Sequence, residues 1–236
     1  MAPYEAVRAH PDGESTLARL ALTASEYGFE GLVVRNADRA SGASVERVRE
    51  EYGIDAVDAV EISAGEPSAA SGRVGNHRSD HTVVIVRGGT PALNRFACEE
   101  PRVDVLARPM AGEGDVDHVL ARAAARNGVR FEFDLGPTLR SSGGRRVRAL
   151  AGLRKLRELV ADADAPFVVS AGAESHLELR APQELRAVGG AIGFSGAVIE
   201  RGLAEWGRLA ARNRERRSER FIEPGVRRGR YEEDDR

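Results

Sequence analysis

Residues 82–108 read TVVIVRGGTPALNRFACEEPRVDVLAR, and they contain the unit from which the fold is built. Thr82–Arg87 (TVVIVR) is a short β-branched run that is apolar on both faces, as expected of a parallel strand covered by helices. The stretch ALNRFACEE reads as a helix, and Val103–Arg108 (VDVLAR) reads as a second strand. A strand, a helix and a strand in this order form the crossover that joins parallel strands.

The same alternation recurs along most of the chain. Seven runs of the strand type follow one another at intervals of about 20 to 37 residues: Tyr4–His10, Gly31–Asn36, Ile54–Ser63, Thr82–Arg87, Val103–Arg108, Val129–Leu135 and Pro166–Ala171. Stretches with helical periodicity lie between them. This pattern predicts an α/β fold of the TIM-like (β/α) barrel kind more than a doubly wound sheet.

Two segments depart from the alternation. Glu66–His81 (EPSAASGRVGNHRSDH) is rich in Gly, Ser and charge, which predicts a long exposed loop. Near the C-terminus, residues 208–230 hold nine Arg against three Glu, and the chain then ends in an acidic run. We therefore expect a barrel domain over residues 1–213 and a flexible tail, Arg-rich and then acidic, over residues 214–236.

The composition excludes several classes of protein. The 236 residues carry a net charge of −2, and the 35 basic residues comprise 34 Arg and one Lys, Lys155. Neither a lysine-containing phosphate loop nor a kinase-type strand can be placed around Lys155, and Schiff-base chemistry is disfavoured. Cys98 is the only cysteine, so disulfides and cysteine-based zinc sites are excluded. Because no run is apolar enough to span a bilayer, we expect a cytoplasmic protein without a membrane partner.

Charged side chains stand where the predicted strands end. In a barrel, functional residues gather at the C-terminal ends of the strands. Those positions hold His10, Arg35, Glu61, Arg87, Arg108, Asp134 and Ser170. Arginine binds phosphate through paired hydrogen bonds, so this rim would suit a phosphorylated ligand or a polynucleotide backbone. The alternative is that these arginines form structural ion pairs with neighbouring acids.

Motifs for protein-based catalysis are missing. The sequence contains no G-x-S-x-G nucleophile elbow and no G-x-G-x-x-G after a strand. The spacing of His77, Asp80 and His81 would suit a metal only on a helix, and the segment reads as a loop. We expect no catalytic residue and no metal ligand. The competing hypothesis is a free-standing, metal-dependent phosphohydrolase that uses His10, Asp134 and His176.

A second basic cluster follows the sixth predicted strand, in residues 135–159, LGPTLRSSGGRRVRALAGLRKLREL. It opens with a Ser-Gly-Gly loop whose small residues let a phosphate approach the backbone, and it continues into a basic helix. The cluster suggests RNA binding, although a solvated basic helix face is the alternative. Aromatic residues make up only 5% of the chain, so recognition would use shape and phosphate contacts rather than base stacking.

Three stretches together carry a family resemblance. They are YEAVRAHPDGESTLARLALTASEYGFEGLVVRN, FDLGPTLRSSGGRRVRALAGLRKL and PFVVSAGAESHLELRAPQELRAVGGAIGF. The chain as far as about Asn213 resembles the ribonuclease P protein component 3 family, also known as the p30 subunit family, of archaea and eukaryotes. The resemblance implies a barrel related to the polymerase-and-histidinol-phosphatase metalloenzymes, with a degenerate metal site. Arg8 and His10 stand where those enzymes carry paired histidines.

The resemblance also implies a function. Family members are subunits of the ribonucleoprotein that removes the 5′ leader from precursor tRNA. The RNA and its Mg²⁺ ions perform the hydrolysis, whereas the protein alone is inactive and binds no cofactor itself. The implied partners are the ribonuclease P RNA, precursor tRNA, protein component 2 and the other protein subunits.

Ten residues are predicted to contact RNA or a partner subunit. Seven match the family's basic and small residues: Arg87, Arg108, Arg140, Gly143, Arg146, Ala173 and Arg180. The two basic clusters add Arg35, Arg145 and Arg148. A scaffold that contacts only protein is a third hypothesis.

Overall fold

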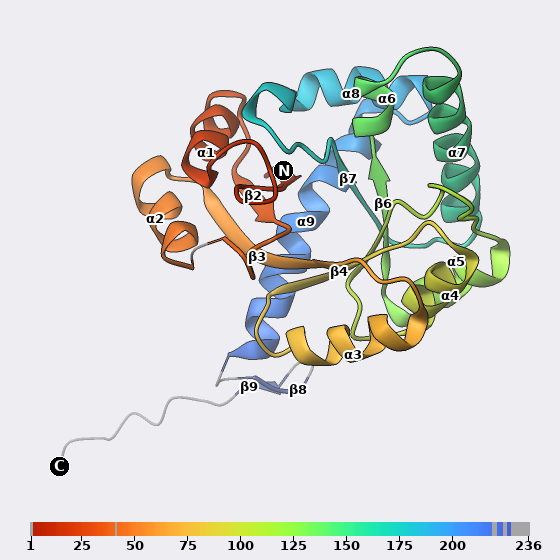
Figure 1. The fold of residues 1–236 in the computed structure, drawn as a ribbon, viewed down its shortest axis with the longest axis horizontal. Helices are drawn as coiled ribbons and strands as arrows, with labels where there is room; N and C mark the ends of the chain where they lie inside the picture. Colours follow the sequence, from red (N-terminus) through yellow and green to blue (C-terminus); the bar gives the residue numbers. More distant parts are fainter. Residues whose placement is uncertain (1, 41, 219–220, 224–225, 228–236) are drawn as a thin grey trace.

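The computed structural model describes residues 2–40, 42–218, 221–223 and 226–227. Seven parallel strands form one sheet in the order in which they occur along the chain (Figure 1). They are β1 (Tyr4–Val7), β2 (Gly31–Val34), β3 (Asp55–Ile62), β4 (Val83–Arg87), β5 (Val105–Ala107), β6 (Arg130–Asp134) and β7 (Phe167–Ser170). Each lies within one of the seven predicted runs, and the predicted α/β barrel is confirmed.

Helices lie between successive strands and after β7, and they cover the outside of the sheet except for α9, which packs against its inner face (Figure 1). They are α1 (Leu17–Glu26), α2 (Gly42–Tyr52), α3 (Pro67–His77), α4 (Pro91–Glu99), α5 (His118–Asn127), α6 (Gly136–Arg140), α7 (Gly143–Asp162), α8 (Pro182–Ala191) and α9 (Gly196–Arg217). A 3-10 turn, η1 (His176–Glu178), precedes α8, and a short antiparallel pair, β8 (Phe221–Glu223) and β9 (Val226–Arg227), follows α9. None of the described helices is long and apolar enough to cross a membrane.

The segment Glu66–His81 was predicted as a loop, and this prediction is wrong. It forms α3, which begins at Pro67, a residue favoured in the first turn of a helix. Ala70 and Val74 lie one helical turn apart and are both buried. Burial of this apolar pair outweighs the low helix propensity of the Gly and Ser residues around it.

The inner face of the barrel has its own apolar core. It comprises side chains that alternate along the strands, Ala6, Val33, Val57, Ala59, Val83, Ile85, Val105, Ala107 and Val168, together with Trp206, Leu209 and Ala210 of α9. The opposite faces of the same strands pack against the helices in a larger core. Helix α9 therefore contributes to the interior that a further strand would otherwise fill.

The first and last strands are joined at a seam that α9 covers. One isolated bridge joins Val7 of β1 to Ala173, which follows β7, and α9 packs against both strands. The indole N–H of Trp206 donates to the carbonyl oxygen of Val169 at 3.0 Å, which satisfies a backbone group that lacks a strand partner. Closure of the barrel consequently depends on α9.

The buried carboxyl group of Glu5, in β1, also bridges the seam to the residues that follow β7. Oε1 of Glu5 accepts hydrogen bonds from the backbone N–H groups of Ala171, at 2.8 Å, and Gly172, at 3.3 Å. It thereby replaces part of the missing ladder between β1 and β7. Burial raises the pKa of Glu5 to about 8, although the N–H donors and Arg35 oppose this rise.

Helix α9 continues beyond Asn213, where the barrel domain was expected to end. Arg214 forms an ion pair with Asp55 at 2.7 Å, and Arg217 donates to the hydroxyl of Thr82 at 3.2 Å. These contacts attach the last turn of α9 to the ends of β3 and β4 at which the strands begin. The flexible tail predicted for residues 214–236 lies largely outside the described residues and stays a prediction.

Substitution of Gly202 tests how closely α9 packs against β7. A Cβ atom at this position would lie 2.5 Å from Cγ2 of Val169, so Gly202→Ala should lower the free energy of unfolding by about 1–3 kcal/mol. Gly190→Ala in α8 is the control, because a Cβ there meets nothing within 4 Å and should be neutral or stabilising by up to about 1 kcal/mol. Denaturant unfolding of both variants measures the difference. A Gly202→Ala protein as stable as the wild type would show that α9 does not pack so closely.

Candidate functional site

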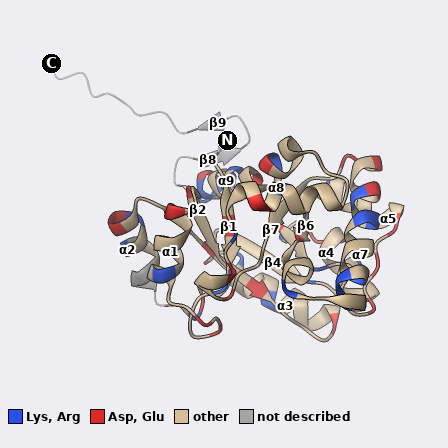
Figure 2. Cartoon of the chain, turned by 90° about the horizontal axis from the view of Figure 1, so that it is seen from above, with Lys and Arg blue, Asp and Glu red and all other residues tan. Residues whose placement is uncertain are grey.

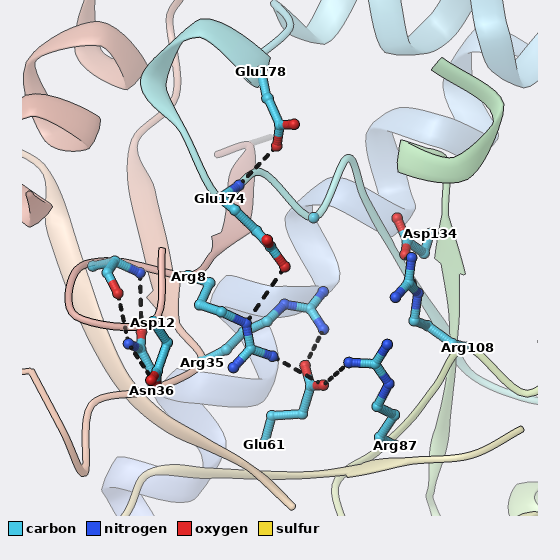
Figure 3. Close-up of polar contacts among 12 residues, drawn as sticks. Arg8, Asp12, Arg35, Asn36, Glu61, Arg87, Arg108, Asp134, Glu174 and Glu178 are labelled. Atoms are coloured by element: carbon cyan, nitrogen blue, oxygen red, sulfur yellow. Dashed lines mark hydrogen bonds and ion pairs between the residues drawn. The ribbon is translucent and has the colours of Figure 1, made fainter. Parts of the chain in front are cut away.

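Five arginines meet at the mouth of the barrel, where the parallel strands end, and Figure 3 labels all of them except Arg140. They are Arg8, Arg35, Arg87, Arg108 and Arg140, and they line a hollow of only about 40 Å³. Arg8 and Arg35 directly follow β1 and β2, Arg87 ends β4, Arg108 follows β5 and Arg140 ends α6. The expectation that Arg35, Arg87 and Arg108 share one rim is therefore confirmed by their positions.

Arg35 lies beneath the surface of this mouth and is 5% exposed. Its guanidinium pairs with Glu61 at 3.0 Å and with both carboxylate oxygens of Glu132, and it also donates to the hydroxyl of Ser170 at 3.2 Å. Burial alone would lower the pKa of Arg35, but Glu132 and Glu61 raise it above its usual value. The side chain is thus a permanent buried cation that neutralises two carboxylates.

Glu61 connects this buried cation to the outer arginines. Figure 3 shows three guanidinium groups converging on its carboxylate, with distances of 3.0 Å to Arg8, 3.0 Å to Arg35 and 3.6 Å to Arg87. Burial alone would raise the pKa of Glu61, but Arg35 and then Arg8 hold it below its ordinary value. A single ionised carboxylate therefore fixes three arginines from three strands.

The remaining side of the mouth is built around Asp134, which faces Arg108 in Figure 3. Nε of Arg108 lies 2.9 Å from Oδ2 of Asp134, and the N–H of Gly136 donates to Oδ1 at 2.9 Å. Burial, then the nearby Glu132, raise the pKa of Asp134 to about 6 in spite of Arg108. Arg108 has a φ of 52°, a strained conformation for a residue other than glycine, which directs its side chain into this pair.

Every arginine of the mouth has an acidic partner. Arg140 pairs with Glu178 at 3.5 Å, and Arg8 approaches Glu174 at 3.7 Å in addition to Glu61. The five guanidinium groups are matched by five carboxylates: Glu61, Glu132, Asp134, Glu174 and Glu178. The structural ion pairs that were the alternative for this rim are therefore present throughout it.

Two predicted contact residues do not reach the surface. The guanidinium of Arg35 is enclosed by carboxylates, and Ala173 is fully buried with its carbonyl accepting from the N–H of Arg8 at 2.9 Å. Neither side chain can touch a bound macromolecule directly, so their direct-contact role is corrected to support of the mouth. Arg180 is half-buried and donates to the carbonyl oxygens of Leu177 and Leu179 at 3.0 and 2.7 Å, which leaves part of its guanidinium accessible.

The basic start of α7 differs from the mouth. Arg145, Arg146 and Arg148 are exposed, and none of them forms an ion pair with the described residues. Gly143 opens the helix with a φ of +57°, and a Cβ there would meet nothing within 4 Å, so its backbone is open to an approaching group. Figure 2 marks basic positions on α7, and the three arginines at its start carry positive charge that no acid among the described residues neutralises.

The mouth does not fit a divalent metal ion. No group of three His, Cys, Asp or Glu side chains that could hold a metal occurs in the described part of the chain. His10 is exposed, Nδ1 of His176 lies 2.9 Å from the hydroxyl of Ser15, and Asp134 is held by Arg108. The metal set of the phosphohydrolase hypothesis is therefore not assembled. The hollow is also far smaller than the 300 Å³ or so at which ligand pockets begin.

Sequence reasoning found the buried acids Glu61 and Asp134 at the strand ends but missed Glu132, the main partner of Arg35. Glu132 was overlooked because it lies within β6, two residues before Asp134, rather than at the end of the strand. The two positions alternate along the strand, so both point to the same face of the sheet. That spacing was the available signal, since the fully apolar neighbours Phe131 and Phe133 mark the other face.

Comparison with known proteins relates the chain to one family. Residues 4–218 match the protein family described as RNase P subunit p30. The ribonuclease P protein component 3 of Halorubrum lacusprofundi is 62% identical over 239 residues, covering 98% of this chain and 99% of that protein. The protein of the same name from Haloarcula marismortui is 57% identical over 225 residues, covering 95% of this chain and 96% of its own length.

Solved structures show the same fold at low sequence identity. A chain in the structure of archaeal ribonuclease P with mature tRNA has a TM-score of 0.82 and 22% identity, covering 99% of this chain and all of that one. The histidinol phosphate phosphatase of Lactococcus lactis, complexed with zinc, L-histidinol and phosphate, has a TM-score of 0.54 and 11% identity, covering 82% and 97%. The fold is thus shared with a phosphatase that was solved with zinc bound, and the mouth of this chain is filled with paired arginines.

Substitution of Arg35 tests whether the buried cation holds the mouth together. Arg35→Met leaves Glu61 and Glu132 buried without their counterion and should cost about 3–5 kcal/mol of stability. Arg87→Met is the control, because this side chain is 41% exposed and its pair should contribute about 1 kcal/mol or less.

The pH dependence of the loss distinguishes unpaired charge from lost packing. Without Arg35, burial raises the folded-state pKa of Glu61 above its unfolded value near 4.3, so the variant loses stability as pH rises. The deficit of Arg35→Met, measured by denaturant unfolding, should therefore be largest at neutral pH and shrink toward pH 4. Equal deficits for both variants, or a deficit that does not change with pH, would contradict this account.

Proposed function

The chain belongs to the RNase P subunit p30 family and is a protein subunit of ribonuclease P, and we propose from this premise that it is a noncatalytic subunit that binds and organises the catalytic RNA. The observation that carries the proposal is the contrast between two basic regions. The mouth holds arginines that are all paired, whereas the start of α7 holds three exposed arginines without an acidic partner in the described structure.

The noncatalytic role is supported by the chemistry of the mouth. Its guanidinium groups would repel a divalent cation, and its carboxylates are already held in ion pairs with them. We assign removal of the 5′ leader to the RNA of the particle and place the Mg²⁺ ions of the reaction on that RNA. This chain contributes no catalytic residue and no cofactor.

We propose that the start of α7 contacts RNA phosphates. Gly143 and Gly144 leave the backbone open to close approach, and Arg145, Arg146 and Arg148 supply charge on the same turn and the next. Phosphate neutralisation of this kind is independent of base sequence and releases counterions from the RNA. It would offset the repulsion between RNA strands that the folded catalytic RNA brings together.

The outer arginines of the mouth form a second part of the same surface. Arg87, Arg108 and Arg140 are partly exposed, and each guanidinium carries five N–H donors, of which its ion pair uses one or two. The carboxylates hold these side chains in place, so they lose little conformational entropy when they bind. We propose that they position RNA rather than supply most of the affinity, and that Arg180 extends this rim.

The remaining partners are proposed on the strength of the family. Within the holoenzyme, the chain would act beside protein component 2 and the other protein subunits and would meet precursor tRNA as the substrate of the particle. A cytoplasmic location stays a prediction. The scaffold hypothesis, in which the chain touches only protein, predicts that α7 makes no contact with RNA.

Removal of two α7 charges tests the RNA contact. In a particle reconstituted from the RNA and its proteins, the affinity of this chain for the RNA is measured as the salt concentration changes. Arg145→Gln with Arg146→Gln should lower the slope of log affinity against log salt by roughly 1.4–1.8, because each lost phosphate contact removes about 0.7–0.9. The control is Arg19→Gln with Arg95→Gln, the same charge change at exposed positions of α1 and α4.

Two outcomes of this titration, and one of omitting the chain from the particle, are informative. A reduced slope for the α7 variant alone supports the contact. An unchanged slope contradicts a phosphate contact at α7 and favours the protein-only scaffold. If leader cleavage and RNA affinity are the same with and without the wild-type chain, the RNA-organising role itself fails.

A further inference from the structure

A second cavity lies at the end of the barrel opposite the mouth. It has a volume of about 370 Å³ and lies where the strands begin, next to the residues that precede β4, β5 and β6. Five arginines line it: Arg78, Arg102, Arg126, Arg212 and Arg216. They come from the end of α3, the α4–β5 connection, the last turn of α5 and the C-terminal half of α9. Only the α9 arginines belong to a cluster visible in the sequence.

Acidic partners here are fewer than arginines. Asp104 is buried and forms ion pairs with Arg78 and with Arg212, the latter at 3.3 Å. Its oxygens also accept from Asn213 and from the backbone N–H of Val84, both at 2.9 Å, so this carboxylate is fully used. The other acid is Glu100, which pairs with Arg102 at 2.7 Å.

Two of the five arginines remain unneutralised. Arg126 and Arg216 are exposed, and neither forms an ion pair with the described residues. Five guanidinium groups thus face two carboxylates, which leaves an excess of three positive charges around one cavity. The mouth, in contrast, matches five with five.

The pKa of Arg212 reflects both its burial and the positive charges close to it. Burial, then repulsion from Arg130, lower its pKa to about 10, although Asp104 acts in the opposite direction. Arg126 and Arg216 stand in the last turns of α5 and α9, where the helix dipole favours a cation. That dipole is equivalent to about half an elementary charge and does not neutralise a guanidinium.

We propose that this cavity is a second binding site for the phosphodiester backbone of RNA, on the face of the barrel opposite the mouth. The proposal rests on the function proposed above. Guanidinium groups match phosphate oxygens in geometry, and no acid among the described residues occupies the donors of Arg126 and Arg216. The chain would then hold two separate RNA segments, one at each end of the barrel.

The lining favours RNA over an acidic protein segment. Protein interfaces usually depend on a few buried apolar anchors. The large exposed apolar residues of the described chain, Leu22, Tyr27, Val119, Val147 and Leu177, are all absent from this cavity. Its apolar members are small or buried, so charge is the property that a ligand can recognise here.

The test compares three double variants in the reconstituted particle. Arg126→Gln with Arg216→Gln should lower the slope of log RNA affinity against log salt by roughly 1.4–1.8 and should expose backbone positions of the RNA to hydroxyl radicals. Arg19→Gln with Arg201→Gln provides the same change in charge at exposed sites away from the cavity. Arg145→Gln with Arg146→Gln reports on α7 in parallel.

The RNA positions that lose protection separate the possible outcomes. Loss at a set of positions different from those of the α7 variant supports two sites. If only the α7 variant changes slope and protection, the second site is overturned and the proposed function stands. If neither variant changes them, both proposals fail. If the cavity variant weakens binding of a protein subunit while RNA binding is unchanged, the cavity binds an acidic protein, and the RNA proposal is overturned.

Discussion

The buried guanidinium of Arg35 is the constraint on which the mouth of this barrel depends. It neutralises Glu61 and Glu132 in the interior, and through Glu61 it fixes the positions of Arg8 and Arg87. A buried carboxylate without such a partner would be protonated or would destabilise the fold. The strand ends can therefore carry a ring of arginines because acids of equal number lie among and beneath them. The same arrangement occupies, in ion pairs, the carboxylates that a metal ion would need.

Closure of the barrel also determines where charged side chains gather. Seven strands leave a seam between β1 and β7, which Glu5 bridges and α9 covers through Trp206. Because α9 then runs to the opposite end of the barrel, its last turns bring arginines beside those of α3 and α5. One helix thus completes the core and also creates the basic cavity. The net charge of −2 conceals a neutral mouth, with uncompensated positive charge beside it at the start of α7 and at the opposite end of the barrel.

The seven strands could be predicted from the sequence because local patterning determines them. Alternation of β-branched runs with helical stretches is a property of neighbouring residues, and every predicted run contains its strand. The α3 segment could not be predicted in this way, because its few apolar residues stabilise a helix only when they are buried against the rest of the fold. The exposed arginines of α7 were recognised as a cluster because they are contiguous.

The pairing of charges could not be predicted, because it joins residues that are distant in the chain. Arg35 and Glu132 are 97 residues apart, and Arg78 meets Arg212 at Asp104 only after the barrel has closed. From the sequence alone, a paired arginine and a free one look the same. The structure separates them, and on this basis we assign most of the RNA affinity to the start of α7, one of the two basic regions that the sequence suggested.

The most direct measurement of the central claim is a photocrosslinking map from the start of α7 in the assembled ribonuclease P particle. Val147 is 64% exposed between Arg146 and Arg148, so a photoreactive residue there removes no packing and no charge. The account predicts efficient crosslinks from position 147 to the RNA, and none from the same probe at the exposed Leu22 of α1. Crosslinks from position 147 to protein subunits alone would contradict it.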